Sequence, residues 1–201
     1  MNKIIHFLFP LRNANKHIDG KIQEINEKYF VDISKSKDKH KDFEIFEKEL
    51  KSQLDRKKGI EDKAKSILFS VTLSVTILIF SVNSLKLNYS NSFDYISLVI
   101  LIIAVFYLIR SAYFSLKALE VKEYNYLVTT KNDTVAEKIE LIKNNEETVL
   151  INAIKTKILN DFRIIKISNY VSIAYSSIKN GIIGFAIVLI MLLIHSFFST
   201  P

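Results

Sequence analysis

The chain has 201 residues, 49% of them hydrophobic, and carries a formal net charge of +7. It contains no cysteine, which excludes disulfides, thiol nucleophiles and cysteine-based zinc or iron–sulfur sites. Its four histidines are scattered without metal-ligand spacing, and the sequence has no glycine-rich phosphate loop or recognisable hydrolase motif. We therefore expect no catalytic residues, no metal site and no cofactor, and we do not expect an enzyme.

Residues 1–65 form the first predicted region, which is highly charged, helical and cytoplasmic. Apolar residues recur at helical spacing over Gly20–Ile33 and again over Asp38–Lys58. The second helix is predicted to end at Gly59, after a basic last turn, and a new helix is predicted to begin at Glu61. Three positive charges would then converge at one helix end, and they are the candidate binding residues for an anionic ligand: Arg56, Lys57 and Lys58.

Residues 66–85 contain no charged side chain and are the first predicted transmembrane helix. A membrane-spanning helix needs roughly 20 predominantly apolar residues, which this run supplies. At about 100° per residue, its polar side chains sort into two stripes. The first stripe consists of Ser66, Ser70, Ser74, Ser81 and Ser84, and the second of Thr72, Thr76 and Asn83.

These two stripes allow two interpretations. Small and hydroxyl residues let helices pack closely, and their hydroxyls bond across helices or to their own backbone. Alternatively, one stripe lines a water-filled path, because hydroxyls hydrogen-bond water and ions without fixing a charge in the membrane. We take the serine stripe as the candidate pore lining. The stripe of Thr72, Thr76 and Asn83 is then a packing surface or an alternative lining.

Residues 86–94 are predicted to be a short external loop, and residues 95–113 the second transmembrane helix. Small residues recur every seven positions along this helix and predict a seam for close packing: Ser97, Ala104, Ser111 and Ala118. Residues 114–180 are predicted to be a cytoplasmic helical region. It contains the continuation of the second span, a helix that begins at Thr134, and a longer helix over Glu147–Lys179.

Residues 181–199 are the third predicted transmembrane helix. Gly181 and Gly184 share a face with His195, which lies near the outer end of this span. A histidine at a membrane interface is usually a hydrogen-bonded surface residue, and the alternative is a pH-sensitive residue that lines the pore. We include His195 among the candidate pore-lining residues.

Basic residues are distributed unevenly along the chain. Sixteen of the 28 lie before residue 66, eleven lie between residues 105 and 180, and the last is Lys86. Because cytoplasmic segments of membrane proteins carry the excess of lysine and arginine, we predict a cytoplasmic N-terminus and an external C-terminus in a bacterial inner membrane. The positive charge itself indicates either attraction to the lipid bilayer or binding of a nucleotide or oligonucleotide.

The predicted fold is all-α: an integral membrane protein with three transmembrane helices and helical cytoplasmic stalks. Only four glycines and two prolines occur, so few positions interrupt a helix. Three helices rarely enclose a conduit by themselves, so a pore would require a homo-oligomer.

Glu61–Ser70 leads from an acidic helix start through Lys-Ala into the first span, and Tyr175–Gly181 leads into the last. Both segments resemble the small multi-span membrane effectors of bacterial anti-phage systems, the SLATT-like and Pycsar-type effectors. The resemblance implies a homo-oligomeric pore or membrane-disrupting effector that stays silent until a nucleotide-type signal changes its state. The expected partner is a nucleotide or oligonucleotide ligand, or a nucleotidyltransferase-type protein. The third span is a departure from the two-span versions.

The predicted function is therefore a membrane pore or ion channel of anti-phage (abortive infection) defence, gated through its cytoplasmic helices. The competing prediction is a non-conducting membrane scaffold whose stalks recruit a cytoplasmic protein.

Overall fold

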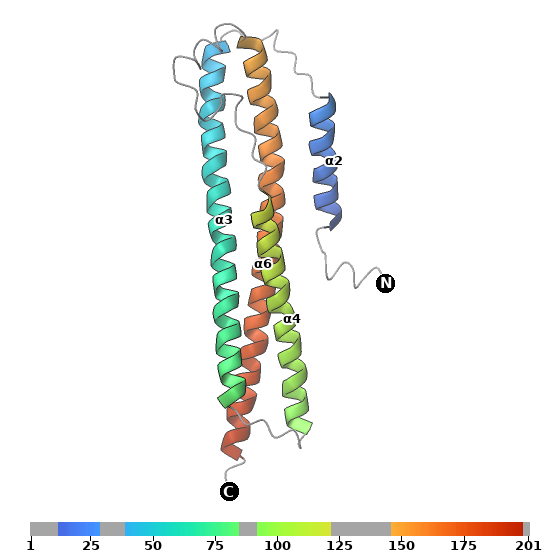
Figure 1. Ribbon diagram of the computed structural model, residues 1–201, viewed down its shortest axis with the longest axis vertical. Coiled ribbons are helices and arrows are strands. Elements are labelled where there is room, and N and C mark those ends of the chain that lie inside the picture. The colour runs from blue at the N-terminus through green and yellow to red at the C-terminus, as the bar shows by residue number, and fades with distance from the viewer. Residues whose placement is uncertain (1–11, 29–38, 85–91, 122–145, 199–201) are drawn as a thin grey trace. The chain divides into compact units, whose positions relative to one another are not determined.

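The computed structural model of the protein describes residues 12–28, 39–84, 92–121 and 146–198 (Figure 1). Except for Val121, these residues are all helical, and no strand occurs among them. The helices are α2 (Arg12–Lys28), α3 (Lys39–Ser84), α4 (Ser92–Glu120) and α6 (Glu146–Phe198). The prediction of an all-α chain is confirmed for this part of the sequence.

The two C-terminal helices extend as the sequence predicts. Helix α4 continues past residue 113 to Glu120. Helix α6 begins at Glu146 and runs without a break through Gly181 to Phe198, so the helix predicted over Glu147–Lys179 does lead into the last apolar run. The predicted helix that begins at Thr134 lies outside the described residues.

Two predictions about the N-terminal helices are wrong. Helix α2 begins at Arg12, not at Gly20, because Asn15 and Ile18 extend its buried stripe toward the N-terminus. Helix α3 runs through Gly59, where a helix end was predicted, and Gly59 has no positive φ. A glycine ends a helix only where it adopts the left-handed conformation, and otherwise it costs the helix about 1 kcal/mol.

By its internal contacts the chain divides into two units, each described separately below. The first unit comprises residues 1–60 and 121–169, and the second comprises residues 61–120 and 170–201. Helices α3 and α6 each contribute residues to both units.

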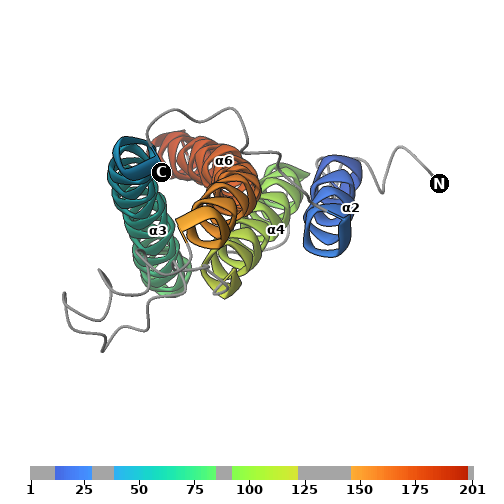
Figure 2. The ribbon, with the colours of Figure 1, turned by 90° about the horizontal axis from the view of Figure 1, so that it is seen from above.

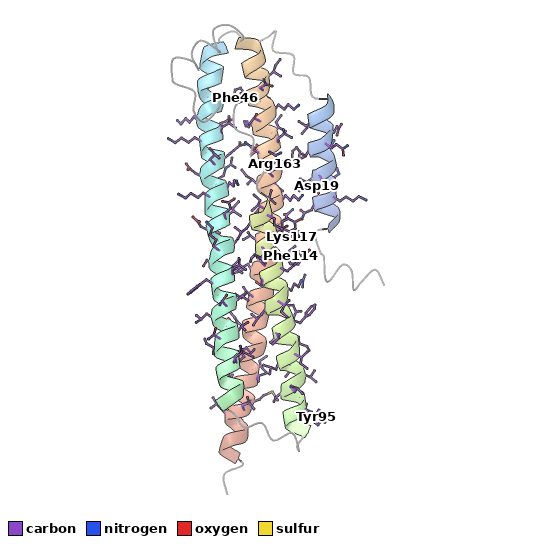
Figure 3. The ribbon with its side chains drawn as sticks, in the orientation of Figure 1. Asp19, Phe46, Tyr95, Phe114, Lys117 and Arg163 are labelled. Carbon is purple, nitrogen blue, oxygen red and sulfur yellow. The ribbon has the colours of Figure 1, made fainter. Side chains whose placement is uncertain are left out.

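In the first unit, α6 contacts both α2 and α3. Lys166 donates a 2.6 Å hydrogen bond to Asp19 of α2, which Figure 3 labels. On α3, Glu49 forms an ion pair with Lys157, and Gln53 Nε2 donates to the Lys157 carbonyl at 3.0 Å. The buried side chains around these contacts are mostly apolar: Ile18, Ile25, Leu50, Ala153, Leu159 and Ile164.

The continuity of α3 predicts the sign of one substitution. A Cβ atom added at Gly59 would meet no atom within 4 Å, and the backbone there is helical. Gly59→Ala should therefore raise the free energy of unfolding by about 0.5–1 kcal/mol, because alanine loses less backbone entropy in a helix. Thermal unfolding followed by circular dichroism measures this change. A destabilised variant would indicate a left-handed glycine cap, where alanine is strained.

Candidate functional site

The second unit contains the predicted packing seam between α4 and α6. The four seam residues are all buried, which confirms the seam: Ser97, Ala104, Ser111 and Ala118. Ser111 Oγ donates a 2.8 Å hydrogen bond to the carbonyl of Ala174 on α6. The end-on view shows the two helices next to each other, in agreement with these contacts (Figure 2).

Two glycines bring the α4 and α6 backbones close together. A Cβ atom at Gly181 would lie 2.9 Å from Leu108 Cδ2 and 3.3 Å from the Ala104 carbonyl oxygen. A Cβ atom at Gly184 would lie 3.1 Å from the Cβ atom of Ala104, which has no rotamer to change. Small residues at such a contact let helices approach closely without a bulky side chain between them.

Large apolar side chains lie on the opposite, exposed surface of the second unit. More than half of each of the following side chains is exposed: Phe69, Ile102, Ile109, Tyr175, Ile190 and Leu193. Two helical stretches, Tyr95–Glu120 with 26 residues and Ile151–Ile194 with 44 residues, are long and apolar enough to cross a membrane. Only 22% of the most apolar window of each is buried within the chain, whereas a core helix of a soluble protein is mostly buried.

The predicted first span lies on α3, and residues 66–85 reach beyond the described part of the chain. This span therefore stays a prediction. The buried stripe of α3 in the second unit consists of Ala64, Ile67 and Val71. At about 100° per residue, the predicted serine stripe borders this buried stripe, whereas the threonine stripe lies on the far side of the helix.

The exposure of the described polar side chains agrees with this geometry. Ser70 and Ser74 are half-buried, while Ser66, Thr72 and Thr76 are exposed. The structure therefore places the two stripes on different sides of α3. The side chains of four further candidates lie outside the described residues: Ser81, Asn83, Ser84 and His195.

Each described hydroxyl of these stripes beyond Ser66 bonds to its own helix. Ser70 donates to the Ser66 carbonyl at 2.9 Å, and Ser74 donates to the Ser70 carbonyl at 2.8 Å. Thr72 and Thr76 donate to the carbonyls four residues earlier at 3.0 Å. The hydroxyl protons are thus satisfied without water, and the oxygen lone pairs are still able to accept a hydrogen bond.

The candidate ligand residues Arg56, Lys57 and Lys58 do not lie at a helix end, because α3 continues to Ser84. Consecutive residues in mid-helix point about 100° apart, so their three charges spread around the helix. The Arg56 guanidinium lies 3.8 Å from the Asp161 carboxylate of α6, which offsets its charge. The prediction that the three charges converge at a helix end is therefore wrong. Whether these residues bind an anionic ligand stays a prediction.

A second group of cations, on α4, was not singled out by the sequence analysis. The Arg110 guanidinium lies 5.8 Å from the centre of the Phe114 ring, and Phe114 stacks with Tyr170 of α6 at 6.2 Å. Lys117 Nζ lies 6.0 Å from the centre of the Tyr113 ring. The sequence signal for this group is the spacing of three, four and seven residues, which places all four α4 side chains within one continuous surface.

The described residues include no group of three or more histidine, aspartate or glutamate side chains that could hold a metal ion. A shallow hollow on α2 is lined by Lys16, His17, Gly20, Lys21 and Glu24. All five belong to a single helix, so they do not enclose a ligand.

Comparisons with protein families, with curated proteins and with solved structures give no match. The function therefore has to be argued from the residues of this chain.

The α4–α6 seam predicts a difference between two glycine substitutions. Gly181→Leu should lower the free energy of unfolding by about 1–3 kcal/mol, because the added side chain overlaps Leu108 and the Ala104 backbone. Gly59→Leu is the matched control, since nothing lies within 4 Å of its Cβ position. Thermal unfolding of the purified variants in detergent measures both changes. Equal stability of the two variants would mean that α4 and α6 do not pack this closely.

Proposed function

We propose that this chain is an integral membrane protein that assembles into a homo-oligomeric pore. The observation that carries the proposal is the exposure of large apolar side chains on the surface of the second unit, together with small residues at its α4–α6 contact. Small and hydroxyl residues such as Ala104, Ser111 and Ala118 are buried, while isoleucines such as Ile102 and Ile109 are exposed. Water would penalise this arrangement, whereas a bilayer solvates the isoleucines and leaves helix packing to the small residues.

The proposed topology has three spans, with the N-terminus in the cytoplasm and the C-terminus outside a bacterial inner membrane. Tyr95–Glu120 and Ile151–Ile194 are apolar enough for two of these spans. The charge-free run at residues 66–85 supplies the third, and the uneven distribution of the 28 basic residues supports the orientation.

The proposed conduction path runs along α3, because its span carries the two polar stripes. Ser70 and Ser74 supply lone pairs to water from one side of the helix, and Thr72 and Thr76 lie on another side, where they are exposed among the described residues. In an oligomer, Thr72 and Thr76 would pack against a neighbouring subunit while the serine stripe faces the central path.

The first unit is the proposed regulatory part. Helices α3 and α6 run unbroken from residues of the first unit into residues of the second, which gives a change in stalk packing a direct route to the spans. A nucleotide or oligonucleotide is the proposed signal, with Arg56, Lys57 and Lys58 as its candidate contacts and a nucleotidyltransferase-type protein as its candidate source. Anti-phage defence is the proposed biological setting.

A second candidate function is a non-conducting membrane scaffold whose first unit recruits a cytoplasmic protein. The specific observation in its favour is the bonding of Ser70, Thr72, Ser74 and Thr76 to their own helix. Hydroxyls that are satisfied in this way sit in lipid or against another helix without needing water.

Single-cysteine labelling tests the topology without background, because the chain contains no cysteine. A cysteine at Lys51 should be protected from a membrane-impermeant maleimide in intact cells, since residues 1–65 are proposed to be cytoplasmic. Cysteines at Ser92 and Ser199 should react from outside. A cysteine at Ser199 that reacts only after the cells are opened would contradict the three-span arrangement.

Liposome flux of the purified protein tests conduction, with and without nucleotides or short oligonucleotides. Ser74→Leu should abolish flux, because an apolar side chain expels water from the narrow path. Thr72→Val, which removes a hydroxyl from the opposite stripe, should reduce flux less than twofold. The oligomer size of both variants in detergent should equal that of the unaltered protein.

The outcomes separate the two candidate functions. Equal flux in Ser74→Leu and Thr72→Val would mean that both stripes are packing surfaces. A complete lack of flux under all conditions, together with a monomeric particle, would favour the scaffold.

A further inference from the structure

Two half-buried cations lie in the C-terminal part of α4. Arg110 and Lys117 are about two helical turns apart, so they share a face of the helix. Tyr113, on the same face, is 46% exposed, and Ile109, which points about 100° away from Arg110, is 63% exposed. Both cations are half-buried, at the border between this exposed surface and the buried Ser111 and Ala118.

The side chains of these cations gather at one pair of aromatic rings. The Arg110 guanidinium lies 5.8 Å from the centre of the Phe114 ring, which belongs to the next turn of the helix. Lys117 Nζ lies 6.0 Å from the Tyr113 ring, and Figure 3 shows Phe114 and Lys117 close together on α4. The stack of Phe114 on Tyr170, with ring planes inclined by 27°, fixes the ring beneath the guanidinium.

The acidic side chain of Glu120 lies at this site. Lys117 Nζ donates a 2.5 Å hydrogen bond to Glu120 Oε2, so the set of Arg110, Lys117 and Glu120 carries a net charge of +1. The Glu120 side chain is 61% exposed, and an exposed ion pair of this kind is weak. A phosphate therefore meets a net positive site, and the planar fork of N–H donors on a guanidinium matches its oxygens.

The depth of Arg110 points to the headgroup region of a bilayer. At 1.5 Å per residue, Arg110 lies about 22 Å along the helix from Tyr95, within a hydrocarbon layer of about 30 Å. The long side chain of an arginine at this depth can carry its charge to the nearer interface by snorkelling. Tyrosines such as Tyr113 and Tyr170 are the residues that membrane proteins place at this level.

We propose that Arg110 and Lys117 bind the phosphate of an anionic phospholipid in the leaflet around the C-terminal end of α4. The site rests on the proposed membrane location of the chain, and it adds a ligand that the proposed pore does not require. A lipid fits better than a soluble phosphate, because exposed Ile109, Tyr113 and Leu116 offer apolar contacts to its glycerol and acyl chains.

Native mass spectrometry of the full chain in detergent tests the site, with phosphatidylglycerol and phosphatidylcholine supplied at equal concentrations. The unaltered protein should retain phosphatidylglycerol preferentially. In the double variant Arg110→Gln, Lys117→Gln, retention of phosphatidylglycerol should fall about tenfold, since charge-assisted hydrogen bonds are lost. Retention of phosphatidylcholine should not change.

The double variant Lys63→Gln, Lys65→Gln is the matched control. It removes the same number of charges from exposed positions on α3 in the same unit. It should bind phosphatidylglycerol as the unaltered protein does, and an equal loss in both double variants would overturn the proposal. Glycerol 3-phosphate is the soluble probe, and binding as tight as that of the lipid would overturn the assignment to a membrane ligand.

Circular dichroism checks that the variants fold. The lipid preference of the unaltered protein is a test that does not depend on the variants. Equal retention of the two lipids by the unaltered protein overturns the proposal whatever the variants do. Carbonate extraction separates this result from a failure of the proposed function. A chain that resists extraction but shows no lipid preference loses only the headgroup site, whereas an extracted chain refutes the membrane location and the site with it.

Discussion

The close contact between α4 and α6 is the constraint on which the second unit depends. Gly181 leaves room for Leu108, and Gly184 leaves room for Ala104, so the backbones approach where larger residues would hold them apart. Because the seam residues of α4 face α6, helix geometry determines the direction in which every other α4 side chain points. Isoleucines such as Ile102 and Ile109 turn outward, and Arg110 and Lys117 lie half-buried at the border of the seam. The apolar surface and the cationic site therefore follow from the same pair of glycines.

The first unit is held together in a different way. Its helices exchange polar contacts, namely Lys166 with Asp19, Lys157 with Glu49 and Asn169 with Asn15. Partly exposed ion pairs contribute roughly 0.2–1 kcal/mol each, so they select which helix faces meet more than they stabilise the unit. Its stability comes from the buried apolar residues around Leu50 and Leu159. The second unit differs in its surface, where large apolar side chains such as Ile102 and Ile109 are exposed.

Helix identity and the α4–α6 seam were predictable from the sequence, because both depend on spacing. Ser97, Ala104, Ser111 and Ala118 recur at seven residues, and all four are buried. The continuity of α3 through Gly59 was not predictable, since the residue type does not reveal the φ angle of a glycine. The convergence of Arg110 and Lys117 on two rings was also missed, because it depends on side-chain direction. The predicted convergence of Arg56, Lys57 and Lys58 at a helix end was wrong because α3 continues past these residues.

The polar stripes of α3 indicate which side of this helix is available for contact with another subunit in the proposed assembly. The side that α3 buries within its own unit is Ala64, Ile67 and Val71, and it is apolar. Thr72 and Thr76 lie on the other side, where the chain itself provides no covering helix among the described residues. Their hydroxyl protons are bonded to the helix backbone, so lipid contact costs little and does not by itself force association. In the proposed oligomer, association would therefore depend on close packing across these small side chains. The proposed subunit contact is then on the threonine side, and the half-buried serines lie beside the proposed path.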